Sequence, residues 1–397
     1  MREVKLGDYI TLAGGGTPSK KNLKYWNGSI PWASVKDLKE DLLTSTVDSI
    51  TEEGLANCPS SLIKAGTVVV CTRMAVGKAV ITAIDTAINQ DLKAVYTSKE
   101  LDKKFLFYLF KANEDYFNSV ATGATVQGIK IEHLKGLRFV LPPLPTQRRI
   151  AAALDLADRQ RQLLREEIAA YGQLGESLFL EMFGDPVGNN KNFPVCKLLS
   201  ASEQITDGTH HSPEPKEFGR PYVTAKHIKL HGLDFKAKPS FISEEAHREI
   251  IKRCCPVKGD VLYIKDGATT GIACINTFEE SISLLSSVAL IKLNKDKLNG
   301  NYLVALLNNL NMQMSLQDKY MSGAAIKRYT IAKIKRFEIP LPPIASQDQF
   351  ANRIQKIEAL KAKAEAALAE ADDLFNALLQ RAFRGELFGE GDKGIRG

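Results

Sequence analysis

A glycine-rich segment near the start of the chain, residues 14–26, carries groups suited to contact with a nucleic acid. It holds Lys20, Lys21, Lys24 and Trp26 behind a run of three glycines. Glycine lets a backbone approach a phosphate closely, and lysine side chains displace the counterions of a polyanion. We therefore expect these residues to contact DNA. An exposed basic loop beside a tryptophan of the core fits the same residues, and the sequence leaves both interpretations open.

Other candidate DNA contacts follow short β-branched runs. Arg73 suits the bidentate reading of guanine, although an ordinary surface ion pair fits it equally, and Gln127 suits adenine. Lys130 stands close to Gln127 and supplies a further cation. In the second half of the chain the corresponding candidates are His210, His211, Lys226, Lys265, Lys327, Arg328 and Tyr329. The adjacent side chains of His210 and His211 diverge and have no third ligand nearby, so we expect no metal site.

Motifs of catalysis are missing from the sequence. There is no GxxxxGK[ST] phosphate loop, and the run Gly14–Gly16 lacks the strand–helix context of a dinucleotide site. Both Pro-Pro pairs follow leucine, so the Asn/Asp-Pro-Pro-aromatic motif of amino-methyltransferases is absent. We expect no catalytic residue, no metal and no cofactor bound by this chain. A nuclease with an unrecognised site is the enzymatic alternative, and metal-dependent cleavage by the chain alone would reveal it.

The chain repeats itself at an offset of 200 residues. GATVQGIKIEHLKGLRFVLPPLPTQ begins at Gly123, and GAAIKRYTIAKIKRFEIPLPPIASQ begins at Gly323. The match includes Gln147/Gln347, and weaker echoes upstream include GTPS at Gly16 and GTHH at Gly208. A fixed-period repeat indicates duplication of a structural unit. The sequence therefore predicts two copies of one globular block, each followed by a helix.

Each globular block has the pattern of an α/β (α+β) domain. In the first block, residues 67–71, 78–84 and 93–97 suit strands and 103–117 suits one helix. In the second, 260–264 and 288–293 suit strands and 301–316 suits one helix. We expect a globular domain at 1–144, a helix at 145–184, a second globular domain at 185–343, a second helix at 344–386 and a disordered tail at 387–397.

The two helical segments carry a heptad pattern over more than four repeats, which is typical of a coiled coil. Both place a basic residue, Arg161 or Lys361, at the same seam position, where a polar residue can set register. Ser346 and Gln349 have the spacing of a capping box. Two independent surface helices remain the alternative. The residues expected to pair the helices are Ile150, Leu154, Leu164, Ile168, Leu178, Ile354, Ile357, Leu368 and Leu378.

Charge and cysteine content agree with a nucleic-acid partner inside the cell. The formal net charge is +7; residues 1–144 contribute +3 and residues 184–343 contribute +6, whereas each helical segment is slightly negative. A polyanion binder places its positive charge in this way. The six cysteines form no CxxC pair, which favours free thiols in a reducing cytoplasm. No apolar run is long enough to cross a membrane.

The chain resembles the specificity subunit of type I restriction–modification systems. The resemblance rests on the two-copy arrangement, on the paired helix openings IPLPP-x₃-Q and LPPLPTQ, and on the motifs GGTPS and DGTH near the start of each block. The resemblance implies two target-recognition domains, each reading one half of a split double-stranded DNA target, held apart by two antiparallel coiled-coil helices. It also implies partners: two methyltransferase (modification) subunits that use S-adenosylmethionine, and restriction/translocase subunits that use ATP and Mg. The rival interpretation is a non-catalytic assembly scaffold whose globular domains bind protein.

Overall fold

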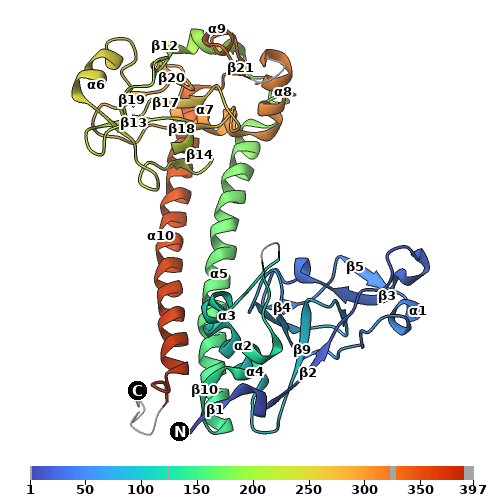
Figure 1. Cartoon of the computed structure of the whole chain (residues 1–397). Coiled ribbons are helices and arrows are strands. Elements are labelled where there is room, and N and C mark those ends of the chain that lie inside the picture. Colours follow the sequence, from blue (N-terminus) through green and yellow to red (C-terminus); the bar gives the residue numbers. More distant parts are fainter. Residues whose placement is uncertain (1, 124–125, 322–327, 389–397) are drawn as a thin grey trace. The chain divides into compact units, whose positions relative to one another are not determined.

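The computed structural model describes residues 2–123, 126–321 and 328–388. Its contacts divide the chain into two compact units. The first unit comprises residues 1–165 and 366–397, and the second comprises residues 166–365. Both long helices, α5 (Leu144–Phe183) and α10 (Ile344–Phe383), run through the division, so each unit contains one globular block and half of each helix (Figure 1).

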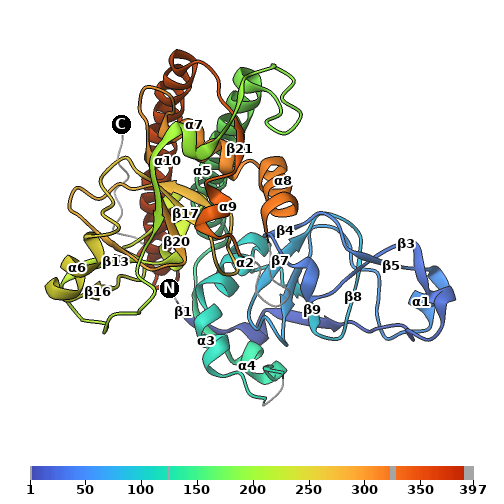
Figure 2. The ribbon, with the colours of Figure 1, turned by 90° about the horizontal axis from the view of Figure 1, so that it is seen from above.

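The first unit is built on a five-stranded sheet in the order β2-β9-β6-β7-β4 and a three-stranded sheet in the order β5-β3-β8. The helices α2, α3 and α4 lie toward α5, and α1 lies at the far end beside β3 and β5 (Figure 2). The elements are β1 (Arg2–Lys5), β2 (Ile10–Gly14), β3 (Trp26–Ala33), β4 (Leu42–Leu43), β5 (Asp48–Ile50), α1 (Glu52–Ala56), β6 (Val68–Cys71), β7 (Ala79–Thr82), β8 (Ala87–Ile88), β9 (Leu92–Thr97), α2 (Lys103–Ala112), α3 (Glu114–Ser119), α4 (Ile131–Gly136) and β10 (Arg138–Leu141).

The second unit repeats this plan in the same chain order. Its sheets run β12-β20-β17-β18 and β16-β13-β19, and a short β14-β15 hairpin takes the place of β4. The elements are β11 (Val195–Lys197), β12 (Ser202–Asp207), β13 (Arg220–Val223), β14 (Ile228–Lys229), β15 (Gly232–Leu233), β16 (Phe241–Ile242), α6 (Glu244–Ile251), β17 (Val261–Ile264), β18 (Ala273–Ile275), β19 (Ser283–Leu284), β20 (Val288–Leu293), α7 (Gly300–Asn308), α8 (Leu310–Tyr320), α9 (Ile331–Ile334) and β21 (Glu338–Pro340).

The single helix expected in each block is two helices. The break falls at Asn113 in the first unit and at Asn309 in the second, which are equivalent positions. Asn309 is extended, and its side chain accepts a hydrogen bond from the backbone N–H of Met312, as an N-cap residue does. The helical spacing of apolar residues did not predict the break, because both halves of the segment keep their apolar residues on one face.

The repeated glutamine joins three parts of each unit. The buried Gln147 amide donates to the carbonyl oxygens of Glu100 and Pro142 at 2.8 Å and accepts from the backbone of Asp102. Gln347 makes the same three bonds, to Lys297, Pro342 and Asn299. All the polar atoms of a buried amide are thereby used, which explains why both copies need glutamine at this position.

The two long helices pack against each other within each unit. In the first unit Asp372 of α10 contacts Arg161 of α5, and the ring of Phe375 of α10 lies against the guanidinium of the same arginine. In the second unit the rings of Phe183 and Phe350 lie 5.4 Å apart. Early residues of α5 meet late residues of α10 and the reverse, so the pairing is antiparallel. Every residue expected to pair the helices is buried or half-buried.

Arg161 occupies the seam with partners on both helices. Its guanidinium lies 2.5 Å from Asp372 and 2.8 Å from Asp158, and its carbon Cζ is 4.2 Å from the centroid of Phe375. A half-buried cation with a carboxylate on the opposite helix disfavours other registers, because a shift leaves the charge unpaired. Burial raises the pKa of the Asp158 carboxyl, and the nearby Lys111 ammonium opposes that shift.

One expectation at a helix end is wrong, and the expected tail differs at its first two residues. The helix α10 begins at Ile344, so Ser346 lies inside its first turn and forms no capping box. Leu387, expected in a disordered tail, is buried in the core of the first unit, and Arg149 lies over the ring of Phe388 at 4.3 Å. Residues 389–397 lie outside the described part of the chain. None of the described helices combines the length and apolar character needed to cross a membrane.

Candidate nucleic-acid interface

The turn that follows β6 is held by backbone hydrogen bonds to two neighbouring segments, at Asp91 and at residues 127–129. The N–H of Thr72 donates to Asp91 at 2.8 Å, and the N–H of Ile129 donates to Thr72 at 2.9 Å. The tip is fixed further by the N–H of Met74, which donates to the carbonyl of Gln127 at 2.9 Å. These bonds bring the predicted contacts Arg73 and Gln127 together, although they are 54 positions apart in the sequence.

The turn that follows β17 in the second unit has the same frame. Lys265 donates from its backbone to Ser287 at 2.9 Å, and Tyr329 donates to Lys265 at 2.8 Å. The bridge between Arg73 and Gly128 in the first unit corresponds to the bridge between Asp266 and Arg328 in the second. We call these segments, residues 71–78 and 264–272, the first and second reading turns.

A hollow of about 620 Å³ lies beside the first reading turn. Its lining combines apolar, aromatic and charged side chains, including Lys20, Leu23, Trp26, Met74 and Asp91. Lys20, Lys21 and Lys24 are exposed, and Trp26 is half-buried with its ring 5.2 Å from that of Trp32. Trp26 therefore packs against a small core cluster, as the alternative interpretation held, and it also lines the hollow.

Arg73 forms the surface ion pair that was its alternative interpretation. Its guanidinium lies 3.3 Å from the carboxylate of Asp91, with half of its side chain exposed. The Asp91 carboxylate is only 13% exposed but also accepts a hydrogen bond from the Asn89 amide, so it keeps a partner when the guanidinium turns to a base. Gln127 is exposed next to Arg73, and Lys130 is exposed at the N-cap of α4.

A buried carboxylate organises the corresponding region of the second unit. Asp207, only 5% exposed at its side chain, lies 2.5 Å from Arg253, 3.3 Å from Lys265 and 3.4 Å from His210. Arg253 and Lys265 place two basic side chains around the single carboxylate, so the cluster has a positive excess suited to an anion. His210 and Arg253 are exposed by more than half, whereas the Lys265 ammonium is turned inward.

The remaining predicted contacts of the second unit have different positions. His211, Lys226 and Arg328 are exposed, and the Lys226 ammonium donates to the hydroxyl of Ser240 at 2.7 Å. Tyr329 is buried against Tyr263 and Phe337 and belongs to the core, so its ring has no access to a ligand. Lys327 lies outside the described residues. The backbone of Tyr329, rather than its ring, supports the second reading turn.

Three residues of these regions were not anticipated: Met74, Asp207 and Arg253. Asp207 opens the DGTH motif, which could have drawn attention to it, whereas Arg253 reaches it from 46 positions away and has no local signal. The glycine of the motif has a packing reason. A Cβ at Gly208 would lie 1.9 Å from the carbonyl oxygen of Leu284, and one at Gly15 would lie 2.1 Å from that of Ile88. The chain must pass close to β19 and β8 at these points.

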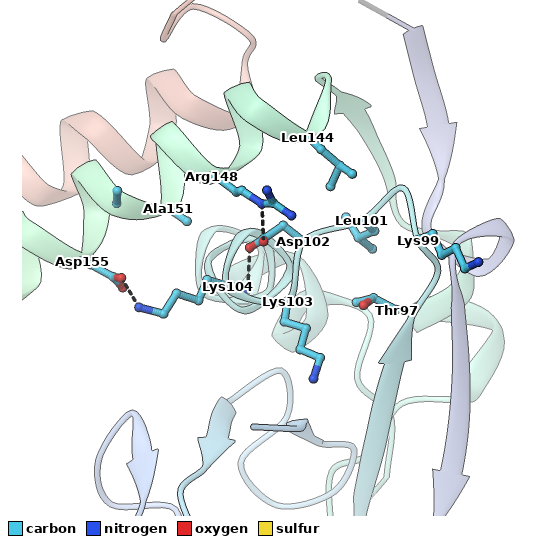
Figure 3. Close-up of a pocket in the computed structure, with 11 residues that line it drawn as sticks. Thr97, Lys99, Leu101, Asp102, Lys103, Lys104, Leu144, Arg148, Ala151 and Asp155 are labelled. Carbon is cyan, nitrogen blue, oxygen red and sulfur yellow. Dashed lines mark hydrogen bonds and ion pairs between the residues drawn. The ribbon is translucent and has the colours of Figure 1, made fainter. Parts of the chain in front are cut away.

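A second hollow, of about 480 Å³, lies where the start of α2 meets α5 in the first unit (Figure 3). Arg148 reaches Asp102 at 3.7 Å, and Lys104 pairs with Asp155, so much of its charge is internally balanced. The second unit has Asp348 and Asn301 at the positions equivalent to Arg148 and Lys104. This hollow is therefore not a shared feature of the two units.

The described residues contain no group of three or more His, Cys, Asp or Glu side chains placed to hold a metal ion. All six cysteines are free. Burial raises the pKa of the Cys254 and Cys274 thiols to about 12, so both stay protonated near neutral pH and are poor nucleophiles.

Comparison with known proteins gives a consistent result. The family model described as type I restriction modification DNA specificity domain matches residues 1–170 and 212–370. The type I restriction enzyme MjaIX specificity subunit of Methanocaldococcus jannaschii is 23% identical over 96% of this chain and 92% of its own length. The EcoR124I/EcoR124II specificity subunit of Escherichia coli is 32% identical over 38% of this chain and 40% of its own length.

Solved structures share the fold. The S subunit of a type I restriction-modification system from M. genitalium superposes with a TM-score of 0.61 at 15% identity, over 96% of both chains. A chain from a structure of type I R-M system assembly and conformational transition gives 0.60 at 18% identity, over 97% of this chain and 98% of its own. The α/β blocks and long helices expected from the sequence are thereby confirmed.

Proposed function

Since the chain belongs to the type I restriction modification DNA specificity family, we propose that its two reading turns each read one half of a bipartite, asymmetric DNA target. One observation carries this proposal. The two turns share a backbone hydrogen-bond frame, yet present different side chains at their tips. A shared backbone frame that carries different exposed side chains suits two domains that contact DNA in the same way but recognise different sequences.

The charges around the turns support a DNA partner. The first reading turn has an exposed cation, Arg73, and lies beside an exposed amide, Gln127. Both side-chain types recognise purine edges in the major groove. Exposed lysines beside the turn suit phosphates, which position a protein but carry no sequence information. Beside the second reading turn, His210 and Arg253 stand around the buried carboxylate of Asp207, so the donors there differ in kind and position.

The long helices are proposed to set the distance between the half-sites. Each has 40 residues and rises roughly 60 Å at 1.5 Å per residue. Two readers on one face of a duplex stand about one helical turn apart, roughly 34–36 Å, or a multiple of it. The helices are long enough to span one such interval.

We also propose that the helices dock two modification subunits. Identical partners require equivalent surfaces, and Leu174 and Leu374 meet this condition. They are the same residue at the same repeat position, and they are 50% and 57% exposed. In this proposal the methyltransferase subunits bind S-adenosylmethionine, restriction subunits use ATP and Mg, and the present chain binds no cofactor. Its free thiols fit the reducing cytoplasm.

Selection of bound duplexes from a randomised library tests the proposal. The chain, alone and with its modification subunits, should enrich two short conserved blocks separated by an unconserved spacer. The salt dependence of binding should be steep, because several phosphates are contacted. Enrichment of no sequence over random duplex, with the partners still assembling on the chain, would instead support a protein-binding scaffold. Metal-dependent cleavage by the chain alone would support a nuclease.

A further inference from the structure

Met74 stands at the tip of the first reading turn in a backbone conformation that side chains disfavour. Its φ is +72°, in the left-handed region, where a Cβ crowds the backbone. Among the described residues, three of the five non-glycine positions with positive φ are asparagine, which tolerates this region well. A methionine there stores strain, and strain of this kind concentrates at functional positions.

The second reading turn shows that the frame does not need a side chain at this point. Its equivalent residue is Gly267, with φ +113°. The bonds on either side correspond: the N–H of Gly77 donates to Cys71 at 3.0 Å, and the N–H of Gly271 donates to Ile264 at 2.8 Å. Gly267 avoids this strain in the second unit. Glycine in place of Met74 would avoid it in the first unit as well.

Packing does not explain methionine either. Met74 is 65% exposed, and its neighbour across the hollow, Leu23, is 80% exposed. An apolar side chain that is strained and left in water contributes little to the stability of the folded chain. The side chain is therefore best explained by something that covers it, and it stands between the predicted base readers Arg73 and Gln127.

We propose that Met74 is a specificity-determining residue of the first half-site, packing its flexible thioether side chain against the 5-methyl group of a thymine in the major groove. This inference rests on the proposed function. Apolar contact with the thymine methyl is one of the few ways in which a side chain without hydrogen-bonding groups can read a base. The bond from Met74 to Gln127 aims the tip, and Lys20 beside the hollow supplies a phosphate contact that orients the duplex.

Replacement of thymine by deoxyuridine is the probe, since it removes only the methyl group. With the full chain and its modification subunits, one thymine-to-uridine change in the first half-site should weaken binding roughly 4-fold, the equivalent of exposing one methyl group. In M74G this sensitivity should vanish at that position alone, while sensitivity in the second half-site stays unchanged. M74G should also unfold at the same or a higher temperature, because glycine relieves the strain.

A second variant separates the effect of the side chain's chemistry from the effect of relieving the backbone strain. M74Q keeps the strain but replaces the apolar tip, so it should lose the same thymine discrimination, whereas M74L should keep it. Full thymine sensitivity in both M74G and M74Q overturns the inference, as does a first half-site where no thymine methyl matters. Failure of the proposed function looks different, because the wild-type complex would then bind no specific sequence at all.

Discussion

The two reading turns share a frame of backbone hydrogen bonds and differ in their side-chain chemistry. In the first, the tip carries Arg73 and Met74 beside a hollow lined by Trp26; in the second, the equivalent residues are Asp266 and Gly267. The frame in each case consists of backbone hydrogen bonds to the strand and loop neighbours. Because no side chain at the tip takes part in that frame, the tips can differ without loss of the fold.

The helices show a different kind of asymmetry. In the first unit the seam is set by Arg161 with Asp372 and by the ring of Phe375. In the second unit the residue facing Ile354 is Gly175, where a Cβ would lie 3.0 Å from the Ile354 Cδ1 atom. Phe375 and Gly175 occupy the same repeat position. The two halves of the helix pair therefore fill their cores with side chains of different size.

The largest expected effect concerns a fragment of residues 1–190, which contains the first block and α5 but lacks the α10 residues of its core. We predict that it forms a homodimer in which the second half of α5 in one copy takes the place of residues 366–383. This homodimer should recognise an inverted repeat of the first half-site. Light scattering and binding to such a palindrome check the prediction, and a stable monomer without that affinity would contradict the pseudo-symmetry.

Gly175→Phe sharpens this test, since its effect should have opposite signs in two contexts. In the fragment it restores the ring of Phe375, which is 3% exposed in the first unit, and should strengthen dimerisation by about 2 kcal/mol, roughly 30-fold, at each of the two equivalent sites of the homodimer. In the full chain it crowds Ile354 and should destabilise by about 1–3 kcal/mol. Destabilisation in both contexts would show that the two halves of the seam are not interchangeable.

Four residues inserted near Glu166 should change the spacer and not the half-sites. They add about 6 Å to α5, which corresponds to one or two base pairs at roughly 3.4 Å each. Four residues also disturb the heptad phase as a stutter, so some affinity should be lost. The control is a variant with four residues inserted near Glu166 and four more near Ala366 in α10, which keeps the two helices of equal length so that they still pair. Selection from duplexes of varied spacer length gives the answer; an unchanged spacer in a folded variant would leave the helices as docking surfaces only.

A smaller effect is expected from the lysines beside the first reading turn. Replacing Lys20, Lys21 and Lys24 with alanine should weaken binding to all sequences alike and reduce the salt slope by up to roughly 3 units. Lys36 provides a matched control, because its ammonium pairs with Asp48 at 2.6 Å within the unit. An unchanged slope in the triple variant would mean that this loop does not face phosphate.

Acid should affect the second unit through its buried histidines. His227 accepts a hydrogen bond from the Thr224 backbone at Nδ1 and so donates from Nε2 to Lys238, which is possible only for the neutral ring. Burial lowers the pKa of His227 and of His247 below 6.5. As pH falls through 6.5 the unfolded chain takes up these protons first, so stability declines. The protection factors of the amides of β13 and β19, which are exchange rates corrected for the intrinsic effect of pH, should fall between pH 7 and 5, and less so in H247Q. Unchanged protection factors would contradict neutral, buried rings.

The repeat and the seam were readable from the sequence because they depend on local periodicity and on matched residues. Gln147 and Gln347 illustrate this: their identity was visible, but their three shared hydrogen bonds were not. The helix breaks at Asn113 and Asn309 were missed, since a cap competes with an unbroken apolar face. Tyr329 was misplaced because an aromatic residue beside Arg328 suits either a surface or a core. The Asp207–Arg253 pair depends on distant segments, which no local pattern reports.

A map of modified bases in the genome of cells with and without this gene tests most directly whether each block reads its own half of one target. Bases modified only when the gene is present should lie in a two-part, asymmetric motif with a spacer of constant length. In cells that carry R73A, the first part of the motif should change while the second part and the spacer stay the same. A continuous motif, modification that does not depend on the gene, or an R73A map altered in both parts would contradict two independent readers on one frame.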